Sequence, residues 1–243
     1  MAAGKSPARQ FDLTSKAAST MRSSLAAIPG LTLALAGPAA VAFVSGRAAR
    51  SAPAFPVHAL SVACIVLIVL AVLALARSSE GLALRGLGFA RVGWSSMAIG
   101  LALALSSIVI FGPFANWAVT QLNMGTFDEG LSTLAKLPAW YLVLTIVIVA
   151  AAEELLYRAY AIESLSAITG SFGIAGTLSL LAFAAAHVPF WGWGPALTTL
   201  VPGAVATLVY IWRRDIVALI IAHIAADLYG IVIAPYVAGK PLM

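Results

Sequence analysis

The sequence predicts an all-α protein: a polytopic membrane helix bundle of about seven to eight transmembrane helices with a polar intramembrane cavity. Three observations lead to this prediction. Hydrophobic residues make up 62% of the 243 residues and charged residues 9%, so the mean hydropathy is +1.01. Apolar runs of about 20 residues, the length that a helix needs to cross a bilayer, recur along the chain. One run contains carboxylates and an arginine, each of which would cost about 2.5–3.5 kcal/mol at a helix centre without a partner.

The formal net charge of +5 does not indicate a nucleic-acid-binding protein. The basic residues are spread between the apolar runs, as the orientation of a membrane protein requires. The single cysteine, Cys64, lies in an apolar run, so an intrachain disulfide is excluded. We therefore expect the lipid bilayer, and no nucleic acid, among the partners of the chain.

Two regions are expected along the chain. Residues 1–24 are basic and rich in Ser and Ala, and they predict a disordered cytoplasmic tail before an uncleaved first span. Residues 25–243 predict a single transmembrane helical domain, in which residues 138–234 hold the polar motifs described below.

Seven apolar stretches are near the length of a spanning helix, and the two most polar joints between them predict other structure. In chain order, the predicted spans are residues 26–45, 56–76, 94–114, 138–160, 173–191, 196–212 and 216–237. The first span contains Gly37-Pro38, where we expect a kink. Arg77–Gly93 predicts an interfacial segment, and Asn116–Lys136 a loop with a short amphipathic helix.

The distribution of Lys and Arg favours a cytoplasmic N-terminus. With that orientation, the cytoplasmic side holds Lys5, Arg9, Lys16, Arg22, Arg77, Arg85, Arg91, Arg158, Arg213 and Arg214, and the outer side holds Arg47, Arg50, Lys136 and Lys240. We therefore predict a multi-pass protein of the cell membrane with its N-terminus in the cytoplasm.

The most informative polar stretch reads A-A-E-E-L-L-Y-R-A-Y. On an α-helix, Glu153 and Glu154 point about 100° apart, so we expect them to serve different purposes. Glu154 and Arg158 are one turn apart and can form an ion pair, whereas Glu153 shares its face with Tyr157. We expect Glu154 and Arg158 to hold the helix and Glu153 to point into a cavity. The alternative is that all these charges reach water at a cytoplasmic helix end.

Two further polar sites follow on later spans. His187 closes the sequence F-A-A-A-H; a lone histidine in an apolar run is more often a packed, hydrogen-bonded residue than a catalyst. His223 and Asp227, in H-I-A-A-D, are one turn apart and share a helix face. Such a pair can share a proton, bind a metal or bind a reacting oxygen, or it can form a structural hydrogen bond.

Together, E-E-x-x-x-R, F-x-x-x-H and H-x-x-x-(Asn or Asp), in this order on successive apolar segments, resemble the CAAX-protease and bacteriocin-processing family of intramembrane proteases, also called CPBP or Abi. The residues that carry the resemblance are Glu153, Glu154, Arg158, Phe183, His187, His223 and Asp227. The resemblance covers about residues 138–234, and the preceding residues match only as generic membrane spans.

The resemblance implies an intramembrane endopeptidase that hydrolyses a peptide bond in a peptide or a membrane-protein substrate. The catalytic residues that it implies are Glu153, Glu154, His187, His223 and Asp227. Structural or positioning roles fall to Arg158, Tyr157 and Phe183.

Amide hydrolysis needs an activated water and donors that stabilise the oxyanion, and two alternatives stay open for supplying them. In the first, Glu153 with His187 activates the water, His223 donates to the oxyanion, and Asp227 orients His223. In the second, the enzyme is a metalloprotease in which His187, His223 and Glu153 hold zinc. The H-E-x-x-H spacing of soluble metalloproteases is absent from the sequence. An ionised Asp227 cannot donate to an oxyanion, whereas an asparagine could.

Two other functions remain as alternatives. A non-catalytic membrane protein of the same fold could confer self-immunity to a peptide toxin or act as a scaffold. A small proton-coupled carrier would also use buried Glu, His and Asp, although the sequence contains no evident inverted repeat. The predicted spans leave His187 near the outer end of its helix, so either that helix begins later or residues 161–172 form an interfacial turn.

Overall fold

The computed structural model describes residues 7–49, 51–89 and 93–239, without the side chains of residues 7–24 and 84–85. All regular structure within this part of the chain is helical, and seven helical stretches are long and apolar enough to cross a membrane. These spans are Leu25–Ala48, Ala54–Ser79, Trp94–Gln121, Ala139–Thr169, Phe172–Trp191, Trp193–Arg213 and Ile216–Val237. The predicted class, an all-α membrane bundle, is confirmed.

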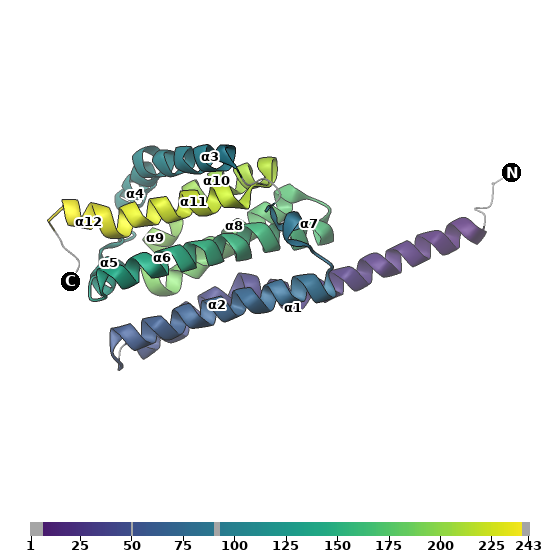
Figure 1. Cartoon of the computed structure of the whole chain (residues 1–243), viewed down its shortest axis with the longest axis horizontal. Helices are drawn as coiled ribbons and strands as arrows, with labels where there is room; N and C mark the ends of the chain where they lie inside the picture. Colours follow the sequence, from purple (N-terminus) through teal and green to yellow (C-terminus); the bar gives the residue numbers. More distant parts are fainter. Residues whose placement is uncertain (1–6, 50, 90–92, 240–243) are drawn as a thin grey trace.

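The spans run alternately up and down the bundle (Figure 1). The first two are α1 (Pro7–Ala48) and α2 (Ala54–Ser79), and the short helix η1 (Leu84–Leu87) follows them. The third span consists of α3 (Trp94–Ser106), the π-helical segment η2 (Ser107–Phe111) and α4 (Gly112–Gln121), after which α5 (Asp128–Leu134) lies at one end of the bundle.

The remaining four spans form the other half of the chain. The fourth span is built from α6 (Ala139–Glu153), the π-helical segment η3 (Glu154–Tyr160) and α7 (Ala161–Thr169). Next come α8 (Phe172–Trp191) and the pair α9 (Trp193–Thr198) and α10 (Leu200–Arg213). The last span contains α11 (Ile216–Asp227), the π-helical segment η4 (Leu228–Ile233) and α12 (Ala234–Val237).

The predicted spans have the right order, but the third and fourth continue further than expected. The third ends at Gln121 rather than at residue 114, so Asn116–Gln121, which we predict as part of a loop, are helical, and the short helix α5 follows. Residues 161–169 are helical and do not form an interfacial turn, and α8 begins at Phe172 rather than later. The chain reverses at Gly170, whose φ of +70° suits glycine, and the Ser171 side chain caps α8 by accepting a hydrogen bond from Ile174 N at 3.3 Å. His187 therefore does lie in the last turns of α8.

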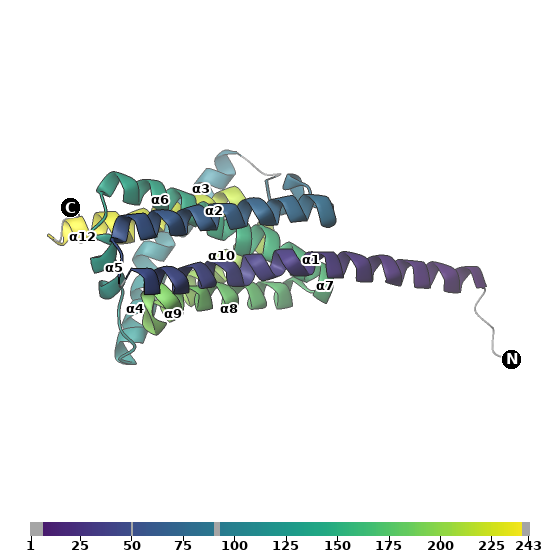
Figure 2. The ribbon, with the colours of Figure 1, turned by 90° about the horizontal axis from the view of Figure 1, so that it is seen from below.

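The N-terminal part of α1 extends away from the bundle (Figures 1 and 2). Residues 7–24, for which we predict a disordered tail, continue the helix. Residues 1–6 lie outside the described residues. Within the bundle, α1 contains both Pro29 and Pro38 and remains one helix.

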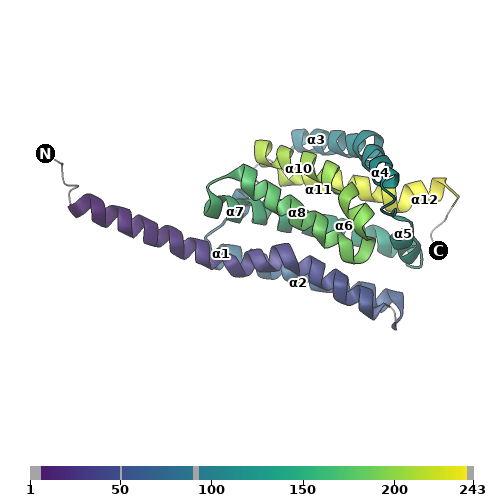
Figure 3. The ribbon, with the colours of Figure 1, turned by 180° about the vertical axis from the view of Figure 1, so that it is seen from behind.

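The helix pair α1 and α2 packs against the fourth span through a polar contact. Glu80, at the end of α2, accepts hydrogen bonds from Tyr160 Oη at 2.6 Å and from Ser164 Oγ at 2.8 Å. Gly30 of α1 lies against the Tyr160 hydroxyl, where no larger side chain fits. The pair thereby covers the outer side of η3 and α7, as the view from behind in Figure 3 also shows.

The third span packs closely on the last one. Ser96 Oγ donates to Asp215 Oδ2 at 2.8 Å, and Asp215 Oδ1 in turn accepts from Ala218 N at the start of α11. One turn further along α3, a Cβ on Gly100 would stand 2.7 Å from Ala218 O and 2.8 Å from Ile221 Cβ. Small residues commonly permit such close contact between membrane helices. These contacts align α3 and α11 in parallel.

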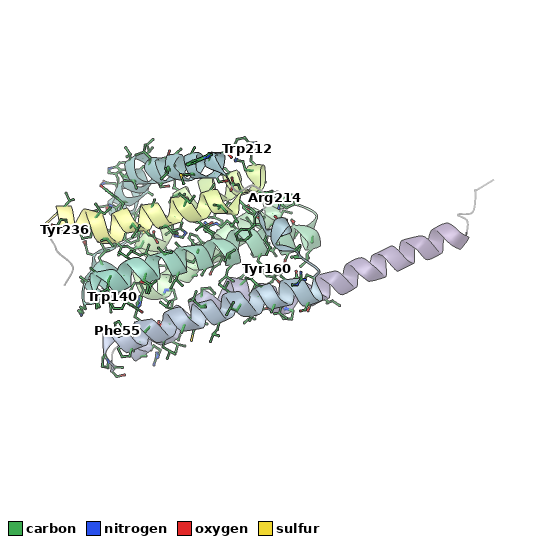
Figure 4. The ribbon with its side chains drawn as sticks, viewed as in Figure 1. Phe55, Trp140, Tyr160, Trp212, Arg214 and Tyr236 are labelled. Carbon is green, nitrogen blue, oxygen red and sulfur yellow. The ribbon has the colours of Figure 1, made fainter. Side chains whose placement is uncertain are left out.

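Aromatic and basic side chains mark the two ends of the bundle. Figure 4 shows Phe55, Trp140 and Tyr236 at one end and Trp212 and Arg214 toward the other, as expected for residues at membrane–water interfaces. The cytoplasmic location of the N-terminus stays a prediction from the distribution of Lys and Arg.

Replacement of Gly100 by alanine is expected to loosen the contact between α3 and α11, because the new methyl group would overlap backbone that cannot move alone. Overpacking of this kind costs about 1–3 kcal/mol, so the thermal midpoint in detergent should fall. The matched control is Gly173→Ala in α8, where the nearest atom to the new Cβ is Ser171 Oγ at 3.7 Å. Equal midpoints for both variants would contradict this packing.

Candidate active site

A cavity of about 550 Å³ lies inside the bundle, a size typical of small-molecule or peptide sites. The wall is formed by the third span, α5, η3, α8, α9, α10 and the last span. Most of the lining side chains are apolar, and the acidic, basic and histidine residues among them are Glu154, Arg158, His187, His223 and Asp227. The predicted polar cavity is therefore present, and α1 and α2 contribute nothing to its described wall.

Each π-helical segment in the described part of the chain contributes to this wall. η2 contributes Ser107 and Ile108, η3 contributes Glu154 and Arg158, and η4 contributes Tyr229, Gly230 and Ile231. A π-helical turn holds more residues than an α-helical turn and is frequent at functional sites. The distortions of three different spans therefore meet at one place in the bundle.

The predicted ion pair between Glu154 and Arg158 forms and is almost completely buried. Arg158 Nη1 donates to Glu154 Oε1 at 2.9 Å, and each residue is 2% exposed. The same oxygen faces His223 Nδ1 at 2.9 Å, which ties η3 to α11. The other carboxylate oxygen, Oε2, is buried without a hydrogen-bond partner among the described residues. Glu154 therefore has one oxygen in a structural contact and one available to a further donor.

The two glutamates do not have the positions that we predict from the sequence. We expected Glu153 to point into the cavity, yet the glutamate of the cavity wall within the described structure is Glu154. The prediction assumed 100° of rotation between residues, but the helix changes from α to π at Glu154, which alters the direction of the side chains. The side chain of Glu153 is 19% exposed, and its Oε2 lies 3.7 Å from His223 Nε2.

His223 lies at the centre of three carboxylates. Its Nδ1 faces Glu154, and its Nε2 lies 3.7 Å from Glu153 Oε2 and 3.5 Å from Asp227 Oδ2. Both ring nitrogens thus face acceptors, the arrangement in which an imidazole can donate from either side. The one-turn spacing of His223 and Asp227 does place them on one face, as the sequence indicated.

His187 belongs to the same cavity but has a different environment. Its Nδ1 lies 2.8 Å from the backbone oxygen of Phe183, one turn earlier in α8. A carbonyl oxygen only accepts, so Nδ1 carries the proton of this hydrogen bond, and Nε2 of a neutral ring keeps its lone pair. Within the described structure no partner occupies that Nε2, which leaves it available to accept from a water or a substrate.

Phe183 connects these side chains. The Arg158 guanidinium lies 4.0 Å from its ring centroid, and the Tyr157 ring packs edge-on at 5.3 Å. Both imidazoles pack against the same phenyl ring, that of His187 at 4.6 Å and that of His223 at 6.2 Å between centroids. All residues of the three motifs therefore meet, with His187 reaching the others through Phe183.

The ligand set considered for zinc is not assembled in this arrangement. No group of three or more His, Cys, Asp and Glu residues in the described ranges is placed to hold a metal ion. His187, His223 and Glu153, as placed, do not form a shared metal site.

Sequence reasoning missed the part of the cavity wall that comes from the third span. Ser107 and Asn116 line the cavity from η2 and α4. Both are polar residues in or next to an apolar run, and this pattern is the one sequence feature that marks them. No motif spacing links them to the histidines, so the sequence alone could not place them at the site.

Comparison with known proteins agrees with the motifs. Residues 135–229 match the model of a family described as Type II CAAX prenyl endopeptidase Rce1-like. The matched segment begins just after α5 and ends in η4, so it includes every residue of the three motifs. No curated protein and no solved structure matches the chain. Residues 135–229 are thus similar to the Rce1-like family, and this match confirms the resemblance to the CAAX-protease and bacteriocin-processing proteins.

Proposed function

We propose that the protein is an intramembrane endopeptidase that hydrolyses a peptide bond in a peptide or membrane-associated substrate. The observation that carries the proposal is the group of three carboxylates around His223 at a cavity inside a bundle of membrane-spanning helices. Charges at this depth are costly and are retained for function. The family match supports the same class of activity, since its description names an endopeptidase.

In the proposed reaction, Glu153 and His187 prepare a water molecule. Glu153 accepts a proton from the water, and the unprotonated Nε2 of His187 accepts its second hydrogen bond. The water oxygen then attacks the carbonyl carbon of the scissile amide. Glu153 is not part of the described cavity wall, and its Oε2 lies 3.7 Å from His223 Nε2. We therefore propose that its side chain turns toward the cavity when substrate binds, since catalytic contacts often tighten only in the substrate complex.

His223 is proposed to stabilise the negative oxygen that forms in this step. Its Nε2–H would turn from Asp227 and Glu153 to the oxyanion, while the hydrogen bond between Nδ1 and Glu154 keeps the ring in place. When the carbon–nitrogen bond breaks, the proton held by Glu153 passes to the leaving amine. The products are a carboxylic acid and an amine, which balances the addition of one water.

Glu154 and Arg158 are assigned a positioning role. The arginine balances the carboxylate that holds His223, and its guanidinium lies on Phe183, against which His187 packs. This one pair therefore sets the orientation of the side chains that would bind the water and the oxyanion.

Glu153→Gln and His187→Ala are each expected to reduce peptide cleavage by about 100-fold or more, the usual contribution of a general base. Cleavage is measured with purified protein in proteoliposomes and a mixture of quenched fluorescent peptides. The matched controls are Glu129→Gln, on the exposed surface of α5, and His58→Gln, whose ring contacts Tyr141 away from the cavity. Full turnover in both Glu153→Gln and His187→Ala would contradict the proposal. It would favour an immunity protein, a scaffold protein or a carrier instead.

Arg158→Met is expected to lower thermal stability strongly, because removal of one partner from a buried ion pair costs about 3–5 kcal/mol. Glu153→Gln should leave the thermal midpoint near that of the unmodified protein, since Glu153 is partly exposed. Arg47→Met is the control, because Arg47 is exposed at the end of α1. An unchanged midpoint for Arg158→Met would show that the pair does not hold the site together.

A metal-independent reaction is expected, because no three of the His and acidic side chains in the described ranges converge on a common point. Elemental analysis of the purified protein should find well under one zinc per chain, and dialysis against a chelator should leave turnover unchanged. One tightly bound zinc whose removal abolishes cleavage would establish the metalloprotease alternative instead.

A further inference from the structure

The third span forms one wall of the cavity, although it lies outside the segment that matches the family. It comprises Trp94–Gln121, whereas the match begins at residue 135. Its contribution to the wall includes Ser107 in η2. The three motifs assign no role to this wall.

The register between α3 and α11 places Ser107 at the level of the end of α11. Ser96 and Asp215, 119 residues apart, share a hydrogen bond, and Gly100 packs against Ala218 and Ile221 one turn later. Both helices continue regularly from there, α3 to Ser106 and α11 to Asp227. Because parallel α-helices rise equally per residue, the same offset brings Ser107 to the level of Ala226 and Asp227.

The hydroxyl of Ser107 differs from that of its neighbour. Ser106 Oγ donates to Ala102 O at 2.8 Å, the usual contact of a serine with its own helix. Ser107 begins the π-helical segment and lines the cavity, and its Oγ has no hydrogen-bond partner in the described part of the structure. Its hydroxyl is therefore available as a donor to a bound group.

The reaction proposed above needs such a donor. Oxyanions of acyl transfer are stabilised by several preorganised donors, and His223 provides one. The position of Asp227 can hold asparagine or aspartate in the motif, but a carboxylate accepts hydrogen bonds and does not donate them. A second donor must come from another residue at the same depth of the cavity.

We propose that Ser107 is that second donor, and that its Oγ–H binds the oxyanion opposite His223. The inference rests on the proposed peptidase function. As water adds to the amide carbon and its proton passes to Glu153, the carbonyl π electrons move to oxygen, which accepts from Ser107 Oγ–H and His223 Nε2–H. Both bonds weaken when the carbonyl forms again and the carbon–nitrogen bond breaks.

The test compares kcat and KM for Ser107→Ala, Ser107→Thr and the neighbouring control Ser106→Ala in proteoliposomes. Removal of one oxyanion donor costs about 100- to 1000-fold in kcat, so Ser107→Ala should lose about 100-fold with KM nearly unchanged. Ser107→Thr retains a hydroxyl and should recover most of this loss, and Ser106→Ala should behave as the unmodified protein. Thermal midpoints of all three variants report folding separately.

A second arm uses Asp227→Asn, which adds an amide donor at the same level. In that background Ser107→Ala should cost much less than it does alone, and the difference is the coupling between the two positions. Equal losses in both backgrounds would show that the two side chains do not serve one oxyanion.

The outcomes separate the two proposals. If the unmodified protein cleaves peptides and Glu153→Gln does not, the function stands; Ser107→Ala with normal kcat would then overturn the role of Ser107 alone. A higher KM at unchanged kcat would also overturn it, because it would indicate ground-state binding. If cleavage is absent or independent of Glu153, both proposals fail.

Discussion

The arrangement of the site depends on the Glu154 carboxylate, which is buried among membrane-spanning helices. A buried charge of this kind is stable only with close partners, and Arg158 and His223 both lie 2.9 Å from the same oxygen. The first contact lies within η3, and the second connects η3 to α11. Since the Arg158 guanidinium stacks on Phe183, α8 is joined to the same group. The fourth, fifth and last spans are thus held together by one acidic side chain.

The fold was largely predictable from hydropathy, and the limits of the fourth span show where hydropathy fails. The predicted span ends at residue 160. The helix continues to Thr169, since Glu163 accepts a hydrogen bond from Tyr210 Oη at 2.9 Å and forms an ion pair with Arg214. Partners on another helix remove the cost of a polar side chain, and a sequence window does not contain those partners.

The site was predictable as a set of residues but not as a geometry. The spacing within each motif correctly paired Glu154 with Arg158 and His223 with Asp227, because residues four apart are neighbours on any regular helix. The positions of Glu153 and Glu154 relative to the cavity were not predictable, since the helix becomes π-helical between them. Packing with other spans, and not local sequence alone, decides at which residue an α-helix becomes π-helical.

Because two parts of the chain form the cavity wall, substitutions in the motif segment and substitutions in the third span have different effects. The charged network lies within residues 135–229, while Ser107, Asn116 and their apolar neighbours face it from a span outside that segment. Substitutions in the third span can therefore reshape the cavity while the ion pairs and the two histidines stay in place. Related chains with identical motifs could diverge in selectivity through this one helix, and a comparison limited to the motifs would not register the difference.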